Sequence, residues 1–266
     1  MGKVYASGDW HGNGELAKQV LDFLQPDDKL IFIGDAIDRG EDGYEIMTQL
    51  LSDKRVIYLK GNHEDMMTNF ITHYLDGFHG NLLWYANGGG STWDKMETLS
   101  DECLKGLAKK ISSLPTEYIY KSPKGHKVIL EHAGYTPFDT PHRSHDPLWD
   151  REHFYDDWDG GFYDDDGDAL RPETTYLVHG HTPVQYLEFH YGYKDQPQKT
   201  KEMIEYGIQW NSYYDCGWTP EVIRYCDGHK FDIDMCTVVS ERIALLDLDT
   251  FETIYFDNKE KQEGVI

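Results

Sequence analysis

The chain has 266 residues, of which 39% are hydrophobic, and its formal net charge is −23 at pH 7. It is long enough to bury a substantial core, but its charge argues against a nucleic-acid partner because phosphate backbones attract basic surfaces. No apolar run reaches the ~18 residues that a membrane-spanning helix would need, so no membrane partner is expected.

Three apolar runs in the first part of the chain are typical of strands, and each leads into a polar segment. The runs are Lys3–Ser7, Lys29–Ile33 and Arg55–Leu59. The segments that follow are G-D-W-H-G at 8–12, G-D-A-I-D-R-G at 34–40 and G-N-H-E at 61–64. Open α/β sheets build their sites at the carboxyl ends of strands, so these polar segments should converge.

The converging segments carry oxygen and imidazole donors, namely Asp9, His11, Asp35, Asn62 and His63. Such a set suits a dinuclear site for borderline divalent metals such as Mn, Fe or Zn. We therefore predict a metal-dependent hydrolase of phosphate esters.

Helical patterns separate these strands. Apolar residues at helical spacing predict helices over Gly14–Leu24 and Gly43–Leu51. The stretch from Glu64 to Leu114 reads as mostly helical, with a break at Asn87–Gly90.

Two later strands lead to further histidines. His132 lies in E-H-A-G-Y-T-P (131–137) after Lys127–Leu130, and His181 lies in V-H-G-H-T-P (178–183) after Thr174–Val178. Taken in order, these segments and the three before them resemble the blocks of the calcineurin-like metallophosphoesterases, in the branch of bacterial and phage Ser/Thr phosphoprotein phosphatases. The resemblance spans roughly residues 3–184 and implies an α/β sandwich of two mixed β-sheets flanked by helices. Phe231–Asp234, Ile243–Leu248 and Thr253–Phe256 resemble the closing strands of that fold.

The resemblance also implies the roles of individual residues. One metal would be held by Asp9, His11 and Asp35, with Asp35 bridging to a second metal held by Asn62, His132 and His181. His63 would protonate the leaving oxygen, and Asp38 would hold its ring. Arg39, Arg151 in L-W-D-R-E (148–152) and Asn62 would bind the substrate phosphate. The implied cofactors are two divalent metal ions, Mn first, with Fe or Zn as alternatives.

Other residues near these blocks have open roles. Lys60 precedes G-N-H-E and is as compatible with a surface lysine as with a third phosphate-binding cation. His179 is expected to support the site or the fold rather than bind metal, because Pro183 replaces the last histidine of the superfamily's G-H-x-H. The segment W-Y-A-N-G-G-G-S-T-W (84–93) fits both a turn between helices and a family segment near the metals.

We expect one metallophosphoesterase domain over 1–266, because no Pro/Ser-rich linker interrupts the motifs. The aromatic-rich stretch 185–228 is expected to be an insertion or a cap. The cysteines form no C-x-x-C pair, and Met1–Lys3 leads straight into a strand without an apolar targeting stretch. These features favour reduced thiols and a cytoplasmic location.

Four functions remain to be separated. The first is a Ser/Thr phosphoprotein phosphatase, with dual specificity as a variant of it, and with a phosphoprotein or small phosphoester as substrate. The second is symmetrical cleavage of dinucleoside tetraphosphates. A diesterase or nuclease is disfavoured by the net charge of −23. A catalytically silent scaffold is disfavoured because every expected ligand and the expected acid are present.

Overall fold

Two five-stranded mixed sheets form the centre of the protein. The computed structural model describes residues 2–78, 83–134, 146–151, 174–184, 219–226 and 228–258. The first sheet has the strand order β10 (Thr253–Asp257), β9 (Arg242–Asp247), β1 (Val4–Ser7), β2 (Lys29–Phe32) and β3 (Val56–Tyr58). The second has the order β4 (Glu117–Lys121), β5 (Lys127–Glu131), β6 (Thr175–His179), β8 (Lys230–Asp232) and β7 (Ile223–Tyr225). The predicted fold class is confirmed.

The three strands that lead into the polar segments run in the same direction. β1 pairs in parallel with β2, and β2 pairs in parallel with β3. In the second sheet, β5 and β6 are likewise parallel. The loops after these strands therefore emerge at one edge of each sheet, which is where α/β proteins place ligands.

The central strands are buried on both faces, which explains their continuous apolar sequence. Along β2, Leu30 and Phe32 face the core that also contains the helices, whereas Ile31 faces the core between the two sheets. Val128 and Val178 of the second sheet join Ile31 in that inter-sheet core. Because successive side chains of a strand point to opposite faces of the sheet, this one short strand contributes to both cores.

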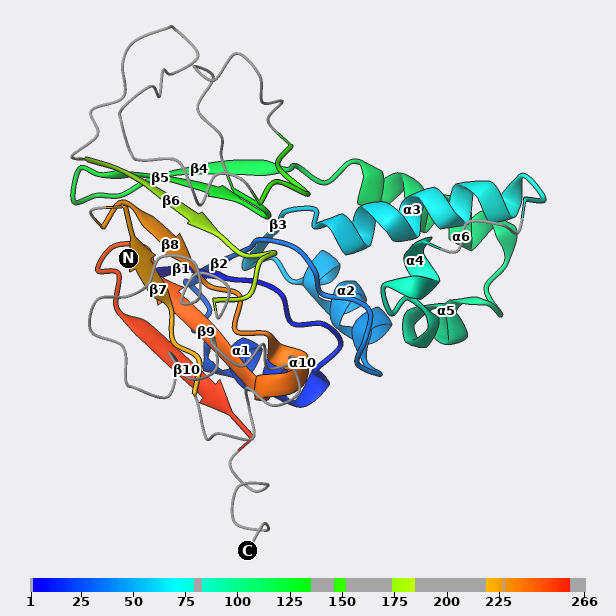
Figure 1. Ribbon diagram of the computed structural model, residues 1–266, viewed down its shortest axis with the longest axis horizontal. Helices are drawn as coiled ribbons and strands as arrows, with labels where there is room; N and C mark the ends of the chain where they lie inside the picture. Colours follow the sequence, from blue (N-terminus) through cyan, green and yellow to red (C-terminus); the bar gives the residue numbers. More distant parts are fainter. Residues whose placement is uncertain are drawn as a thin grey trace, which may run out of the picture.

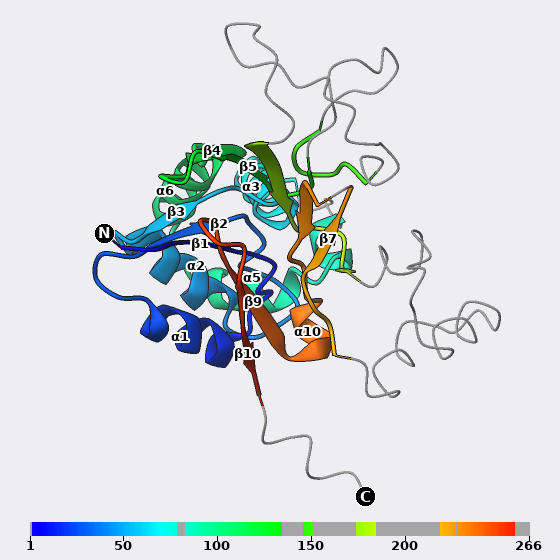
Figure 2. The same ribbon diagram turned by 90° about the vertical axis from the view of Figure 1, so that its left-hand side faces the viewer.

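Helices cover the outer face of the first sheet and extend from it as an arm. α1 (Gly14–Phe23) and α2 (Gly43–Ser52) lie beside the sheet, and α3 (Asn62–Leu75) packs against α6 (Asp101–Ser112) in the arm (Figures 1 and 2). The short helices α4 (Leu83–Ala86) and α5 (Gly90–Met96) lie between them in sequence. The Asn13 side chain caps α1, and the Ser100 side chain caps α6. None of the helices in the described ranges is both long and apolar enough to cross a membrane.

The observed elements follow the predicted ones closely, with three additions. β4, β7 and the short α10 (Thr237–Ser240) were not predicted. β4 alternates exposed and half-buried residues at a sheet edge, so it lacks a strong apolar pattern. β7 begins inside the stretch expected to be an insertion, and 185–218 of that stretch lies outside the described residues.

The loops after β2 and β3 touch through two glycines. Gly34 has φ +106°, and a Cβ built on it would lie 2.5 Å from both the Cα and the backbone nitrogen of Gly61. Such a separation is far below normal contact, so any side chain at position 34 would push the two loops apart. Both loops carry site residues in the very next position, Asp35 and Asn62.

We expect Gly34→Ala to lower the free energy of unfolding by at least about 2 kcal/mol, because it adds both the clash and an unfavourable φ. Gly106→Ala is the matched control, since Gly106 lies exposed within α6 and a Cβ there meets nothing within 4 Å. It should raise that free energy by about 0.5–1 kcal/mol through helix propensity. Urea unfolding of both variants measures the difference, and equal midpoints would refute the close-contact argument.

Candidate active site

The site residues come from loops held in unusual backbone conformations. Positive φ angles occur at Asp9, His11, Asp35, Asp38, Arg39 and His181. Non-glycine residues seldom adopt this region, and such strain concentrates at functional sites. Hydrogen bonds between the loops hold it in place: the amide of Asp9 donates to Gly34 O, and that of His11 donates to Asp35 O, each at 3.0 Å.

One group of donors forms around His11 and Asp35, both 2% exposed. His11 Nδ1 lies 3.0 Å from the carbonyl oxygen of Ile37, to which it can only donate, so its Nε2 keeps the lone pair. That Nε2 lies 3.7 Å from Asp35 Oδ2. Burial, followed by the charges of Arg39 and His63, holds the pKa of His11 well below its usual range. A neutral imidazole with a fixed tautomer is the form that binds a metal.

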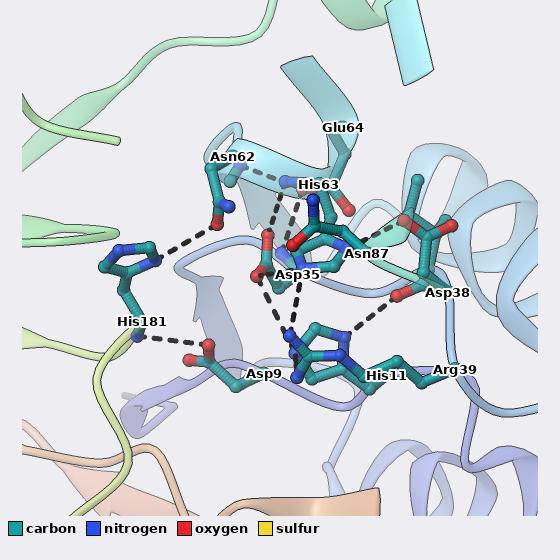
Figure 3. Close-up of polar contacts among 12 residues, drawn as sticks. Asp9, His11, Asp35, Asp38, Arg39, Asn62, His63, Glu64, Asn87 and His181 are labelled. Carbon is teal, nitrogen blue, oxygen red and sulfur yellow. Dashed lines mark hydrogen bonds and ion pairs between the residues drawn. The ribbon is translucent and has the colours of Figure 1, made fainter. Parts of the chain in front are cut away.

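Asp9 lies beside this group (Figure 3). Its Oδ1 accepts a hydrogen bond of 3.1 Å from the amide of His181, whereas its Oδ2 has no hydrogen-bond partner in the described part of the chain. The side chain is 1% exposed. Burial and the nearby charges of Asp234 and Asp35 raise the pKa of Asp9. A cation at Oδ2 would relieve both the lost hydration and the repulsion.

A second group of donors forms around Asn62, at the start of α3. Asn62 Oδ1 lies 2.8 Å from His132 Nε2 and 3.1 Å from His181 Nδ1. His132 Nδ1 donates to the carbonyl oxygen of Ile33 at 3.0 Å, so its Nε2 faces Asn62 and Asp35. Burial acts to lower the pKa of His132, but the charge of Asp35 outweighs it and raises that pKa, so the ring holds a proton at Nε2 that a cation bound here would replace.

The two groups share one carboxylate. The ligand atoms of His11, Asp35 and His63 lie within 4.8 Å of one another, and so do those of Asp35, His132 and His181. Burial acts to raise the pKa of Asp35, but His132, His63 and His11 outweigh it and hold that pKa well below its usual range. An ionised Asp35 between two sets of imidazoles has the position that a bridging ligand requires. These residues fit a pair of divalent cations.

His63 is held differently from the other histidines. Its Nδ1 lies 2.7 Å from Asp38 Oδ2, and its Nε2 points toward the donor groups, 3.8 Å from Asp35 Oδ2. Asp38 is fully buried, and burial raises its pKa. Two donors stabilise it: Thr92 Oγ1 lies 2.8 Å from Oδ1, and Trp84 Nε1 lies 2.7 Å from Oδ2. A carboxylate held in this way fixes the ring of His63 with Nε2 toward the site.

Thr92 and Trp84 were not among the predicted site residues. Both come from the segment 84–93, which the sequence left open between a turn and a part of the site. The structure shows that it serves the site, because the segment supplies two of the hydrogen bonds to Asp38.

Two arginines supply positive charge on the exposed side of the site. Arg39 places Nη1 2.8 Å from His11 Nε2 and Nη2 3.2 Å from His63 Nε2. Arg151 places Nε 3.2 Å from His181 Nε2. Both side chains are exposed and lie against buried imidazoles, so their guanidinium groups border the donor groups. Lys60 forms an ion pair with Asp65 at 2.9 Å instead.

His179 belongs to neither donor group among the described residues. Its Nε2 lies 2.7 Å from the hydroxyl of Tyr225, on the neighbouring part of the second sheet. Burial lowers the pKa of His179 to about 3, so the ring is neutral. This placement agrees with a supporting role in the fold.

Glu64 was the most important residue that the sequence reasoning missed. Its Oε2 accepts hydrogen bonds of 2.9 Å from the amides of Asp35 and Gly61, and its Oε1 accepts from the amide of Ala36 and the hydroxyl of Tyr58. The side chain is fully buried. One carboxylate therefore ties the Asp35 loop to the start of α3 (Figure 3). Its place in G-N-H-E, three residues after the cap position, was the available sign.

We expect Glu64→Gln to lower the free energy of unfolding by about 2–4 kcal/mol, because its amide group would face backbone N–H donors that need an acceptor. Tyr58→Phe removes one donor to the same carboxylate and should cost about 1 kcal/mol. Chemical denaturation of the two variants tests this. A loss no larger in Glu64→Gln than in Tyr58→Phe would show that the loop does not depend on the carboxylate.

Comparisons with known proteins identify a family and several relatives that this chain resembles. The family model of calcineurin-like phosphoesterases matches residues 2–210. Serine/threonine-protein phosphatase 2 of Escherichia coli is 31% identical over 138 residues, covering 50% of this chain and 58% of that protein. An asymmetrical bis(5′-nucleosyl)-tetraphosphatase of Oceanobacillus iheyensis is 28% identical over 167 residues, covering 59% of this chain and 63% of that protein. This chain thus spans less than two thirds of the length of either relative.

A crystal structure described as a candidate diadenosine tetraphosphatase shares the fold. Its TM-score is 0.54 at 16% identity, and the alignment covers 96% of this chain and 93% of the other. The resemblance read from the motifs is confirmed by the family match. The chain belongs to the calcineurin-like phosphoesterases, a family of metal-dependent hydrolases.

Proposed function

We propose that this protein hydrolyses phosphate monoesters with two divalent cations. The observation that carries the proposal is the pair of donor groups that share Asp35 beside the His63–Asp38 pair. Asp9, His11 and Asp35 would hold one cation, and Asp35, Asn62, His132 and His181 would hold the other. When bound, such cations clamp the phosphoryl oxygens and supply a water of lowered pKa. We propose Mn as the metal.

The other residues would orient the ester and move one proton. Arg39 and Arg151 border the donor groups with exposed guanidiniums, a geometry suited to phosphate oxygens, and Asn62 would add its amide to the same phosphate. His63 would donate a proton from Nε2 to the leaving oxygen while Asp38 keeps its Nδ1 side fixed. Asp38 is fully buried and His63 is only 2% exposed, so little water reaches the pair.

For the substrate we propose first a Ser/Thr phosphoprotein, with phosphotyrosine as a second ester type. The D-R-G, G-N-H-E and L-W-D-R-E segments and the likeness to the Escherichia coli phosphatase support this choice. We propose a single domain, which the family match over 2–210 and the pairing of β9 with β1 support. We also propose a cytoplasmic location, on the sequence features given above.

Hydrolysis of dinucleoside tetraphosphates is the second candidate. The expected mode was symmetrical cleavage; the Oceanobacillus relative is named as asymmetrical, so its likeness supports the substrate class and not the symmetrical mode. The diadenosine tetraphosphatase candidate shares the fold. Against it, a polyphosphate needs a broad basic surface, and the net charge of this chain is −23.

We expect Mn-loaded protein to turn over a phosphoserine peptide faster than diadenosine tetraphosphate or bis-p-nitrophenyl phosphate, with a phosphotyrosine peptide also cleaved. A chelator should abolish all turnover. Parallel assays at matched concentrations measure the order. Faster cleavage of the dinucleotide would promote the second candidate, and chelator-resistant turnover would contradict the dinuclear mechanism.

Two substitutions separate metal binding from proton transfer. Asp35→Asn should lower the metal content of the purified protein, because it weakens the shared ligand. His63→Asn should lower kcat on a phosphoserine peptide by about 10²–10⁴-fold and much less on p-nitrophenyl phosphate, whose leaving group needs no acid. The control His73→Asn alters an exposed histidine on α3 and should change neither quantity. Equal losses on both esters would refute the role of His63 as acid.

A further inference from the structure

A pocket opens along α3 next to the site. Its volume is about 260 Å³, and its lining consists of Asp65, Met66, Asn69, Leu83, Trp84 and Trp149. Whole-ligand sites are usually larger, from about 300 Å³ upward. The pocket therefore suits one chemical group of a substrate rather than a complete molecule.

The lining from α3 lies on the same helix face as Asn62. Asp65, Met66 and Asn69 follow Asn62 by three, four and seven residues, which is the spacing of a single helix face. With a rise of about 1.5 Å per residue, the pocket extends roughly 10 Å along the helix from Asn62. Its lining begins at Asp65, about one helical turn beyond Asn62.

Two tryptophans connect the pocket walls to the site residues. The ring of Trp149 lies edge-on to His181, with 6.0 Å between centroids. Trp84 is fully buried and donates from Nε1 to Asp38, the partner of His63. The pocket therefore borders the second donor group through His181 and the support of His63 through Asp38.

The walls are apolar and the outer rim is polar. Trp149 is 40% exposed and Leu83 is 57% exposed, so both offer apolar surface to an incoming group. At the rim, the Asp65 carboxylate is already neutralised, because Lys60 lies 2.9 Å from Oδ1 and Asn69 Nδ2 lies 3.1 Å from Oδ2. An uncharged ring can enter without meeting an unpaired charge.

We propose that this pocket receives the aromatic ring of an aryl phosphate, such as a phosphotyrosine side chain, with Trp149 as its stacking partner. The inference rests on the proposed phosphomonoesterase function. An aryl phosphate bonds its apolar ring directly to the ester oxygen, whereas a nucleotide places a polar ribose there. The neutralised rim would face the peptide that carries the ring.

The test compares phenyl phosphate with glycerol 2-phosphate, using Mn-loaded full-length protein. The ratio of kcat/KM for phenyl phosphate to kcat/KM for glycerol 2-phosphate should fall about tenfold in Trp149→Ala, because stacking on the indole is lost. It should stay within about twofold of the wild-type ratio in Trp149→Phe, which keeps an aromatic face. Leu83→Ala should lower the ratio by a smaller factor. Phe78→Ala is the control, since Phe78 is an exposed aromatic residue after α3 that does not line the pocket.

Three results would overturn the proposal. Equal losses on both esters in Trp149→Ala would show that this residue only supports His181. An unchanged ratio would show that the ring does not enter the pocket. If Trp149→Ala lowered kcat/KM for adenosine 5′-monophosphate but not for phenyl phosphate, the pocket would be assigned to a nucleobase.

A binding measurement separates this inference from the proposed reaction. Calorimetry with benzylphosphonate and ethylphosphonate, in which carbon replaces the ester oxygen, needs no turnover. Benzylphosphonate should bind about tenfold more tightly, and the preference should vanish in Trp149→Ala. That outcome without hydrolysis of any ester would retain the pocket and reject the phosphatase. Hydrolysis without the preference would reject the pocket alone.

Discussion

The arrangement of the site depends on one buried carboxylate. Glu64 accepts hydrogen bonds from the amides of Asp35, Ala36 and Gly61, which belong to two loops from adjacent parallel strands. Without an acceptor at this point, these amides would be buried and unpaired, which proteins rarely tolerate. The bonds bring the Asp35 loop against the start of α3 and so place Asp35 next to His63, whose amide donates to Asp35 Oδ1 at 3.0 Å.

The protonation of the site carboxylates is set by burial and by neighbouring charged groups, because solvent has little access to them. Asp35 stays ionised because imidazoles surround it, whereas the neighbouring Asp9 is raised in pKa by burial and by like charges. Exposed Arg39 and Arg151 add positive charge at the edge of this acidic group. A protein with a net charge of −23 can therefore still present a cationic border to an anionic ester, because local charge decides binding at short range.

The two-sheet architecture explains how residues far apart in sequence come to lie within a few ångströms of one another. Parallel pairing of β1 with β2 and of β5 with β6 directs their following loops to a common edge (Figure 1). The inter-sheet core, in which Ile31 packs with Val128 and Val178, fixes the distance between the two sheets. Positive φ angles in the loops are then tolerated, because the close-packed sheets leave the loops no alternative path.

The sequence by itself determined the buried central strands, the order of the blocks and the donor types, because buried parallel strands need continuous apolar runs and ligands need specific atoms. The place of Asp35 after such a run predicted it as a donor, whereas the role proposed for His132 came from the resemblance of its block to the family. The tertiary structure alone decided which groups support them. Thr92 and Trp84 reach Asp38 from a segment about 50 residues away, and only packing brings them there. The pocket beside Trp149 exists for the same reason: its walls come from three separate segments, and no local pattern records their contact.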